Sequence, residues 1–363
     1  MSFAGLDAWL RAQAAADQFS GVVLIRRGDT TVFSGAYGWA TRRWAVPVTL
    51  ATRFDTASIT KLFTSVAALD LVDQGRLDLD ARITEVVELT GTTISPAVTL
   101  RHLLTHTSGI ADDADEEAGE DYAALWVDKP CYAVIQTRDF LPQFAHKPAM
   151  FPPGGGCRYC NVGYVLVGLA IEVVTGTSYR DHIRGTLFTR AGMTASGFYD
   201  RREPVPDVAE GWDPVIDDAG NRIGWTQNIF SYPPIGSPDG GAHVTAEDLV
   251  RFAQTVRSGR LLSAELTEQF LTPQVVHHER DDWVVWYGFG LEFVTDRNGT
   301  IRNTYKDGGN AGASGIVRYY PADRLDVVVL SNSERGAWGP VDEVHRLIRA
   351  DNPGIGESGD GFR

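Results

Sequence analysis

The sequence predicts an α/β fold of the α+β kind: an antiparallel sheet built from both ends of the chain and flanked by helices, with a mostly helical region inserted between its two halves. Three observations support this prediction. Strand-like runs joined by short turns lie near the N-terminus and again after residue 283. The sequence between them has mainly helical periodicity. We find no internal repeat and no low-complexity segment.

The N-terminal part of the sheet is predicted from two short, apolar and β-branched runs at residues 21–25 and 31–33. The Arg-Gly-Asp turn at residues 27–29 between them is typical of a hairpin. Residues 1–21, ahead of these strands, have an amphipathic helical pattern. They lack the basic start, apolar core and cleavage site of a secretory signal, so we expect a cytoplasmic location.

The inserted region is predicted from helical periodicity that begins near Ser58 and continues to Gly75. From there to about residue 235 the sequence is mostly helical, with helices expected over residues 100–104 and 162–175. Thr245 is the expected N-cap of a later helix over residues 246–258.

The C-terminal part of the sheet is predicted as an antiparallel meander with strands over residues 284–294, 301–306, 315–320 and 325–330. Turn residues separate them at 298–299, 308–309 and 321–323. A helix over residues 341–348 follows.

We therefore expect a divided chain. Residues 1–57 and 236–350 form the predicted sheet domain, 58–235 form the inserted helical domain, and 351–363 form a flexible tail.

The composition is that of an acidic globular protein. Among 363 residues, Lys and Arg total 33 and Asp and Glu total 47, which gives a net charge of −14 at pH 7. Proteins that bind nucleic acids release counterions through a basic face, so this balance argues against a nucleic-acid partner. No stretch reaches the roughly 18–20 apolar residues of a membrane helix, so no membrane span is expected.

Seven acidic residues crowd the segment 112–121, and no Lys or Arg follows until Lys129. The segment lacks the spacing and the obligatory Gly of a calcium-binding loop. We expect a solvated, mobile loop here, and no metal site.

The cysteines and two nearby histidines give no sign of a cofactor. Three cysteines are too few and too odd in number for a disulfide framework. Cys157 and Cys160 have the spacing of a redox or zinc pair but no second pair, so free thiols are expected. His102 and His106 lack a metalloprotease motif, so we attribute them to helix packing and local hydrogen bonds. There is no P-loop, dinucleotide fingerprint or Gly-x-Ser-x-Gly elbow.

The most informative string is Ser58-Ile59-Thr60-Lys61. A Ser and a Lys three apart on a helix share one face. A hydroxyl needs a base within hydrogen-bond reach to act as a nucleophile, and a Lys is such a base when desolvation or a nearby positive charge lowers its pKa. A helix start also directs backbone N–H groups at an oxyanion. Ser58 and Lys61 are therefore candidate catalytic residues.

Two further elements accompany this string. Tyr159 and Asn161 stand two apart after a Gly-rich loop, so an extended segment aims both side chains the same way. Lys306-Asp307-Gly308-Gly309 follows a strand-like run, and its glycines allow a backbone to approach a substrate closely.

The three elements, in this order, resemble the motifs of the serine β-lactamase and penicillin-binding-protein superfamily. The likeness is to its class C-type branch, which includes family VIII esterases, DD-peptidases and D-amino-acid-specific peptidases. It extends over roughly residues 20–335, with further similar segments at residues 100–110, 151–161 and 238–249. The resemblance implies a β-lactamase/transpeptidase-like fold.

The resemblance also implies a role for each matching residue. Ser58 is implied as the acylated nucleophile, Lys61 as its base or proton shuttle, and Tyr159 as the group that exchanges protons with Ser58 and the leaving group. The residues implied to hold the substrate are Asn161, Lys306, Asp307, Gly308 and Gly309, with the backbone N–H groups of Ser58 and Gly309 as the oxyanion hole.

Two positions depart from the family pattern. Cys160 stands where the family usually has Ser, and we expect its side chain to point away from the pocket. Asp307 stands where a hydroxyl residue usually helps to bind a carboxylate. An ionised aspartate only accepts hydrogen bonds and repels anions, so Asp307 favours a neutral ester, or an amide that carries an amine, over a β-lactam. No counterpart of the deacylating Glu of class A β-lactamases is evident.

We therefore predict a serine hydrolase that acts through a covalent acyl-enzyme on a small-molecule or short-peptide ester or amide. An acyltransferase with the same acyl-enzyme is an alternative, decided by which nucleophile the cleft admits. A non-catalytic binding or scaffold module of the same fold is a second alternative, and a metal-dependent hydrolase that uses the acidic segment and the histidines is a third. The sequence does not determine an oligomeric state.

Overall fold

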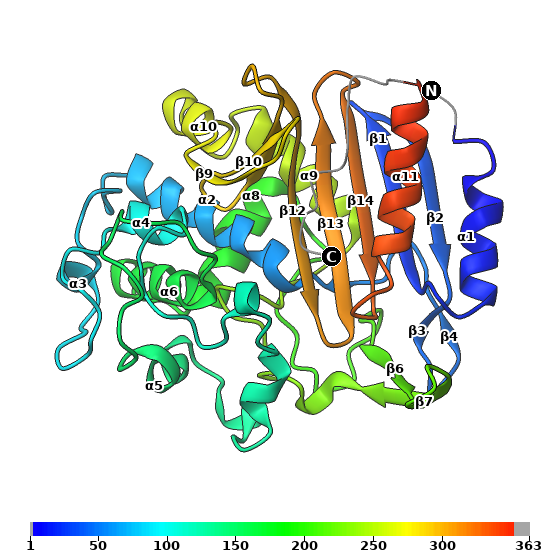
Figure 1. The fold of residues 1–363 in the computed structure, drawn as a ribbon, viewed down its shortest axis with the longest axis horizontal. Coiled ribbons are helices and arrows are strands. Elements are labelled where there is room, and N and C mark those ends of the chain that lie inside the picture. The colour runs from blue at the N-terminus through cyan, green and yellow to red at the C-terminus, as the bar shows by residue number, and fades with distance from the viewer. Residues whose placement is uncertain (1–2, 352–363) are drawn as a thin grey trace.

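A computed structural model describes residues 3–351, and its centre is an eight-stranded antiparallel sheet. The strand order is β2-β1-β14-β13-β12-β11-β10-β9 (Figure 1). The two ends of the chain meet where β1 pairs with β14, and Gly21 lies opposite Ser331. The predicted sheet built from both termini is therefore confirmed. The strands are β1 (Gly21–Arg27), β2 (Thr30–Tyr37), β9 (Val275–Glu279), β10 (Val284–Tyr287), β11 (Glu292–Thr295), β12 (Ile301–Asn310), β13 (Ala313–Tyr320) and β14 (Leu325–Ser331).

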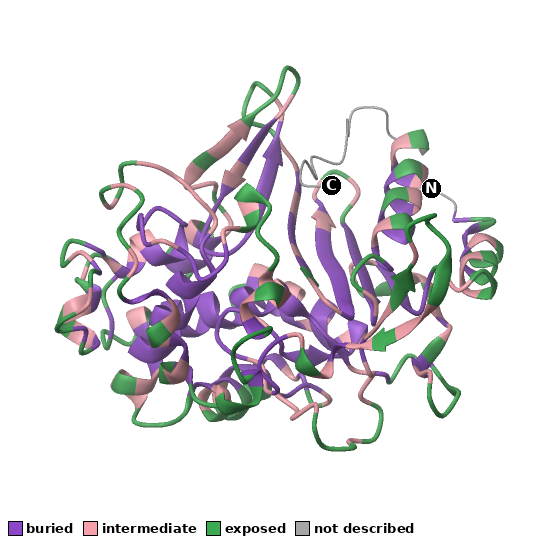
Figure 2. Ribbon diagram, turned by 60° about the horizontal axis from the view of Figure 1, so that its bottom comes forward, coloured by how far each residue is buried: buried purple, intermediate pink, exposed green. Residues whose placement is uncertain are grey.

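Both faces of the sheet are covered because successive strand side chains point to opposite sides. In β1, Val22 and Leu24 belong to the core shared with the inserted helices, whereas Val23 and Ile25 pack toward α1 (Leu6–Ala15) and α11 (Trp338–Asp351). The apolar run at residues 21–25 is consequently buried throughout. Figure 2 shows buried central strands that lie next to largely buried helices of the inserted region.

The inserted region is built around two buried helices, α2 (Thr60–Asp73) and α6 (Asn161–Thr175), which pack against each other. Their many apolar side chains, with small residues at several positions, permit close packing on all sides. Shorter helices complete this region: α3 (Ile83–Val86), α4 (Leu100–Leu104), α5 (Leu141–Phe144), α7 (Tyr179–His182) and α8 (Thr189–Ala191). Two helices follow it in the chain, α9 (Ala246–Arg257), which packs against β1 and β14, and α10 (Ala264–Phe270). Thr245 caps α9, as predicted, by accepting a hydrogen bond from the Asp248 N–H.

Several predicted boundaries were wrong. Residues 284–294 form two strands, β10 and β11, because Gly290 turns the chain with a φ of +81°. The glycines at 308–309 lie within β12, and the turn comes at Ala311–Gly312 instead. The region predicted to be mostly helical also contains a two-stranded sheet, β6 (Trp212–Ile216) and β7 (Arg222–Gln227).

The division into a sheet domain and a helical domain stays a prediction. The predicted tail lies outside the described residues, apart from Asp351 at the end of α11. Within residues 3–351 no single helix has the length and apolar character to cross a membrane. One bent pair, Asn161–Thr175 with Tyr179–Ala191, meets those criteria jointly, with an angle of 74° between its halves.

Candidate active site

Ser58 lies on a 3-10 turn (Ala57–Ile59) that connects β5 (Phe54–Asp55) to α2. The preceding Ala57 has a φ of +43°, a conformation that a residue with a Cβ adopts only under strain. Two hydrogen bonds hold it: the Ala57 N–H donates to Asp55 Oδ1 at 2.8 Å, and the Ala57 carbonyl accepts from the Gly241 N–H at 3.3 Å. The turn directs Ser58 into a cavity.

Lys61, one turn further along, is buried and has three polar neighbours. Its Nζ lies 3.0 Å from Ser58 Oγ, 2.7 Å from Asn161 Oδ1 and 2.7 Å from the carbonyl oxygen of Asp239. Burial, opposed by the Asp239 carboxylate and assisted by the positive charge of Lys306, lowers the pKa of Lys61 to about 8. A neutral Lys61 can give its two N–H groups to the carbonyl oxygens and direct its lone pair at Ser58.

Tyr159 is the second side chain that contacts the Ser58 hydroxyl. Its hydroxyl donates to Ser58 Oγ at 2.8 Å. Burial raises the pKa of Tyr159 well above its usual value, and the carboxylate of Glu116 adds to this, so the phenol stays protonated near neutral pH. The Nζ atoms of Lys61 and Lys306 lie 4.9 Å and 5.1 Å from the centre of its ring.

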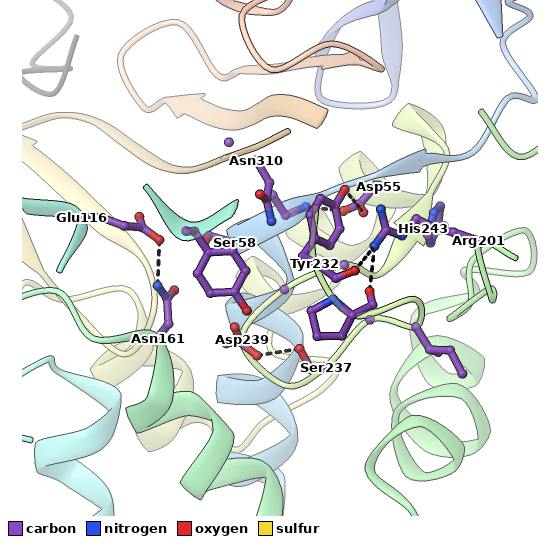
Figure 3. A pocket seen from close by; sticks show the side chains of 18 residues that line it. Asp55, Ser58, Glu116, Asn161, Arg201, Tyr232, Ser237, Asp239, His243 and Asn310 are labelled. Carbon is purple, nitrogen blue, oxygen red and sulfur yellow. Dashed lines mark hydrogen bonds between the residues drawn. The ribbon is translucent and has the colours of Figure 1, made fainter. Parts of the chain in front are cut away.

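Asn161 is the first residue of α6, and both ends of its amide are engaged. Oδ1 accepts from Lys61 Nζ, and Nδ2 donates to Glu116 at 2.8 Å (Figure 3). Cys160 is buried, and its Sγ lies 3.6 Å from the carbonyl oxygen of Ile110.

The third element places Lys306 on β12, fully buried. Burial alone would lower the pKa of Lys306, but the carboxylates of Glu292 and Asp307 outweigh it and raise the pKa, so this lysine stays charged. Its Nζ lies 2.7 Å from Glu292 Oε1 and 3.8 Å from Asp307 Oδ1. Asp307 faces the cavity, and its side chain is 39 % exposed.

Gly308 lies against the backbone that carries Ser58. A Cβ at this position would lie 2.4 Å from the carbonyl oxygen of Thr56 and 2.8 Å from the Ser58 nitrogen. Only glycine therefore permits β12 to run this close to the turn. Gly309 follows and lines the cavity beside Ser58.

Two cavities meet at Ser58. The first lies toward Asp239, Tyr232 and His243. Figure 3 shows this cavity, with the Ser237 hydroxyl donating a hydrogen bond to the Asp239 carboxylate. The second has a volume of about 280 Å³. Its lining includes Glu116, Glu117, Tyr159, Tyr287, Glu292, Tyr305, Lys306, Asp307 and Trp338.

The acidic segment 112–121 is only in part the solvated loop that its composition predicts, because residues 112–114 are buried whereas 116 and 118–121 are exposed. Asp112 is buried and accepts hydrogen bonds from the Asn161 and Val162 N–H groups at 2.7 Å and 3.0 Å. Glu117 accepts from the Tyr159 N–H at 2.9 Å. These carboxylates accept hydrogen bonds from backbone N–H groups at the start of α6 and from the Tyr159 N–H just before it. Such N–H groups have no partner within the helix, which explains why an acidic run folds over the site.

His106 was not recognised as part of the site. Its Nδ1 accepts from the Cys160 N–H at 3.1 Å, and its ring lies 4.7 Å from that of Tyr159. Burial, together with the charges of Lys306 and Lys61, holds the pKa of His106 well below its usual value. The His106 ring is therefore neutral, and it packs against the Tyr159 ring. Its φ of +58°, unusual for a non-glycine residue, is invisible in the sequence.

Comparison with known proteins places the chain in a family. The family model described as Beta-lactamase matches residues 6–350. The chain belongs to the beta-lactamase family. This confirms the resemblance and the fold class predicted from the motifs.

Relatives of this beta-lactamase family member are named hydrolases and penicillin-binding proteins. Penicillin-binding protein 4 of Amycolatopsis lactamdurans is 31% identical over 326 residues, which cover 82% of this chain and 76% of the relative. A D-aminopeptidase of Cereibacter sphaeroides is 30% identical over 87% of this chain and 57% of its own length. Esterase EstB of Burkholderia gladioli is 28% identical over 65% of each. The protein is thus an enzyme of a serine hydrolase family with peptidase and esterase relatives.

Solved structures agree with this assignment. A penicillin-binding protein from Bacillus halodurans has a TM-score of 0.84 and 35% identity, with 93% of this chain and 99% of that one covered. An octameric penicillin-binding protein homologue from Pyrococcus abyssi has a TM-score of 0.80 and 26% identity over 96% of this chain and 78% of its own.

The structure gives no candidate metal centre: among residues 3–351, no three His, Cys, Asp or Glu side chains gather in a way that could hold an ion. Cys131, Cys157 and Cys160 are free thiols.

Proposed function

We propose that this beta-lactamase family member hydrolyses a small ester or amide through a covalent ester on Ser58. The observation that carries the proposal is that Ser58 Oγ lies within hydrogen-bond distance of both Lys61 Nζ, at 3.0 Å, and Tyr159 Oη, at 2.8 Å. A nucleophile between an amine whose pKa is lowered to about 8 and a protonated phenol has a group that can act as a base on one side and an acid on the other.

In acylation, Lys61 takes the hydroxyl proton while Ser58 Oγ attacks the carbonyl carbon. The carbonyl oxygen becomes an oxyanion that the backbone N–H groups of Ser58 and Gly309 stabilise. Tyr159 gives its proton to the leaving alcohol or amine as that bond breaks, and it regains a proton from Lys61. The charged Lys306 lies beside the Tyr159 ring and stabilises the transient phenolate.

In deacylation the same groups act in reverse. Tyr159 passes its phenol proton to Lys61 and takes a proton from the water that attacks the acyl carbon, and Lys61 then returns its proton to Ser58 Oγ as the ester bond breaks. The products are a carboxylic acid and free enzyme.

Intact-protein mass spectrometry with a fluorophosphonate tests the nucleophile, with wild type compared to Ser58→Ala. We expect one adduct in the wild type and none in the variant. A matched control is Ser65→Ala on the same helix, which must still label. Labelling of a folded Ser58→Ala protein would overturn the assignment. Parallel incubation with a penicillin and an activated short-chain ester then narrows the substrate class.

A further inference from the structure

Asn161 and Glu116 together define what binds next to the nucleophile. In the family resemblance this amide binds a substrate amide, but here Nδ2 donates to the Glu116 carboxylate at 2.8 Å. One of the two N–H groups of Nδ2 is therefore given to Glu116, and a substrate carbonyl that took the other would bring its oxygen close to a carboxylate oxygen, with which it cannot form a hydrogen bond. A group that donates hydrogen bonds would instead be bound by Glu116.

The charges of the cavity point the same way. Three of its carboxylates have a cation nearby: Glu292 lies 2.7 Å and Asp307 3.8 Å from the same Lys306 Nζ, and Glu117 lies 3.5 Å from Arg158 Nη1. In the described part of the chain, the side-chain hydrogen bond of Glu116 is to a neutral amide. The lining of the cavity therefore contains more carboxylates than cations. Among the described residues Glu116 has no cation in ion-pair contact, and Lys61 and Lys306 act on it only from a longer distance.

Glu116 also lies in the same cavities as the nucleophile. It lines both cavities that meet at Ser58, on the side opposite Asp239 and Ser237 (Figure 3). A substrate whose carbonyl carbon reaches Ser58 Oγ therefore places a substituent on its α-carbon near this carboxylate.

We propose that Glu116 is a specificity-determining residue that selects substrates with a protonated amine on the carbon next to the scissile carbonyl, and that it disfavours substrates with a carboxylate there. The inference rests on the proposed acyl-enzyme at Ser58. Asp307, on the other wall of the cavity, acts in the same sense by repelling anions.

Three phenyl esters of nearly equal shape test the inference: phenyl glycinate, phenyl propionate and monophenyl malonate. They place an ammonium, a methyl and a carboxylate at the same point. Rates are measured at pH about 6.5, where an α-amine is protonated. Each kcat/KM is divided by the rate of hydroxide-catalysed hydrolysis of the same ester. This removes the intrinsic activation that the ammonium group gives.

We expect Glu116→Gln to lower the glycinate-to-propionate ratio by about tenfold, equivalent to about 1.4 kcal/mol, and to raise the malonate rate. Glutamine keeps the hydrogen bond to Asn161, and any effect on Lys61 is common to the three esters. The matched control is Glu120→Gln, which lies in the same acidic segment but lines neither cavity. A ratio that stays within about twofold of wild type in Glu116→Gln overturns the inference.

Failure of the proposed function gives a different result, namely propionate turnover that survives in Ser58→Ala. If the protein cleaves none of the three esters, a measurement that needs no turnover tests the inference instead. Glycinamide, but not the isosteric propionamide, is then expected to slow labelling of Ser58 by a fluorophosphonate, and to do so less in Glu116→Gln. Equal protection by the two amides overturns the inference.

Discussion

Two buried lysines flank Tyr159, and their surroundings give them opposite properties. Lys61 lies at the start of α2 with two carbonyl oxygens and a hydroxyl as partners, and its pKa falls to about 8. Lys306 lies on β12 with the carboxylate of Glu292 at 2.7 Å, and its pKa is raised.

The difference shows that burial alone does not decide the charge of a lysine. Removal from water disfavours the ammonium at both positions. A neutral acceptor compensates part of that cost, whereas a carboxylate in direct contact more than compensates it. The site thereby obtains a base and a fixed positive charge from the same residue type, with the two Nζ atoms 4.9 Å and 5.1 Å from the centre of one tyrosine ring.

The largest expected effect comes from removing the lysine with the lowered pKa. Lys61→Met leaves Ser58 without its base, so kcat/KM for phenyl propionate is expected to fall by about 10²–10⁴. Lys306→Met removes only an electrostatic contribution and is expected to cost less. Steady-state kinetics of the two variants checks this order, and a greater loss in Lys306→Met would reverse the assignment of the base.

Glu292→Gln tests the carboxylate that keeps Lys306 charged. Without it, a buried ammonium loses its closest anion, and the free energy of unfolding at pH 7 is expected to fall by up to about 3 kcal/mol. Denaturant unfolding measures this. The double variant Glu292→Gln/Lys306→Met is expected to recover part of the loss, because no buried charge remains. A single variant as stable as wild type would show that the pair contributes nothing.

The pH dependence of stability separates the two lysines. The pKa of Lys61 is about 8 in the folded protein and 10.5 as its ordinary value. The unfolded chain therefore binds more protons between these values, and folding stability rises with pH across that window, by about 3 kcal/mol in all.

The Lys61→Met variant lacks this increase in the free energy of unfolding with pH. Its stability should therefore fall relative to that of the wild type from pH 8 to pH 10. The pKa of Lys306 is raised instead, so its contribution is constant in this window and is lost only at higher pH. Unfolding curves at several pH values check both expectations, and a parallel course of wild type and Lys61→Met would contradict the first.

Asp239→Asn gives the smallest expected change and sharpens the comparison. The Asp239 carboxylate exerts the largest effect that holds the pKa of Lys61 up against burial. In the wild type the Ser237 hydroxyl donates to the Asp239 carboxylate at 2.6 Å, and asparagine keeps an acceptor for this hydroxyl. The ascending limb of kcat/KM, along which Lys61 loses its proton, should move to lower pH by up to about one unit. A move to higher pH would mean that another group titrates.

The parts of the site that the sequence predicts are those set by local spacing or by a recognisable motif. Ser58 and Lys61 share a face because they are three apart on a helix start. Tyr159 reaches Ser58 across 101 residues, and only the family resemblance connected the two. The sheet was predictable because strand runs at both ends need partners, although its turns at glycine positions were misplaced.

The rest could not be predicted because it depends on contacts that composition misrepresents. An acidic run normally indicates solvation, yet Asp112 is buried since it satisfies N–H groups 49 and 50 residues away. Gly308 suggests a turn, yet it lies in a strand because the Ser58 backbone leaves no room for a Cβ. Glu292 and His106 carry no motif of their own.

The pairing of β1 with β14 has a consequence for synthesis. Ser331 Oγ donates to the carbonyl oxygen of Ser20, 311 residues earlier in the chain. At about 5–20 residues per second, the first strand waits roughly 15–60 s on the ribosome before its partner is made. The wall of the cavity formed by β12 also comes late, so Ser58 and Lys61 leave the ribosome long before they can act. The nascent protein is therefore inactive until nearly the whole chain has been translated.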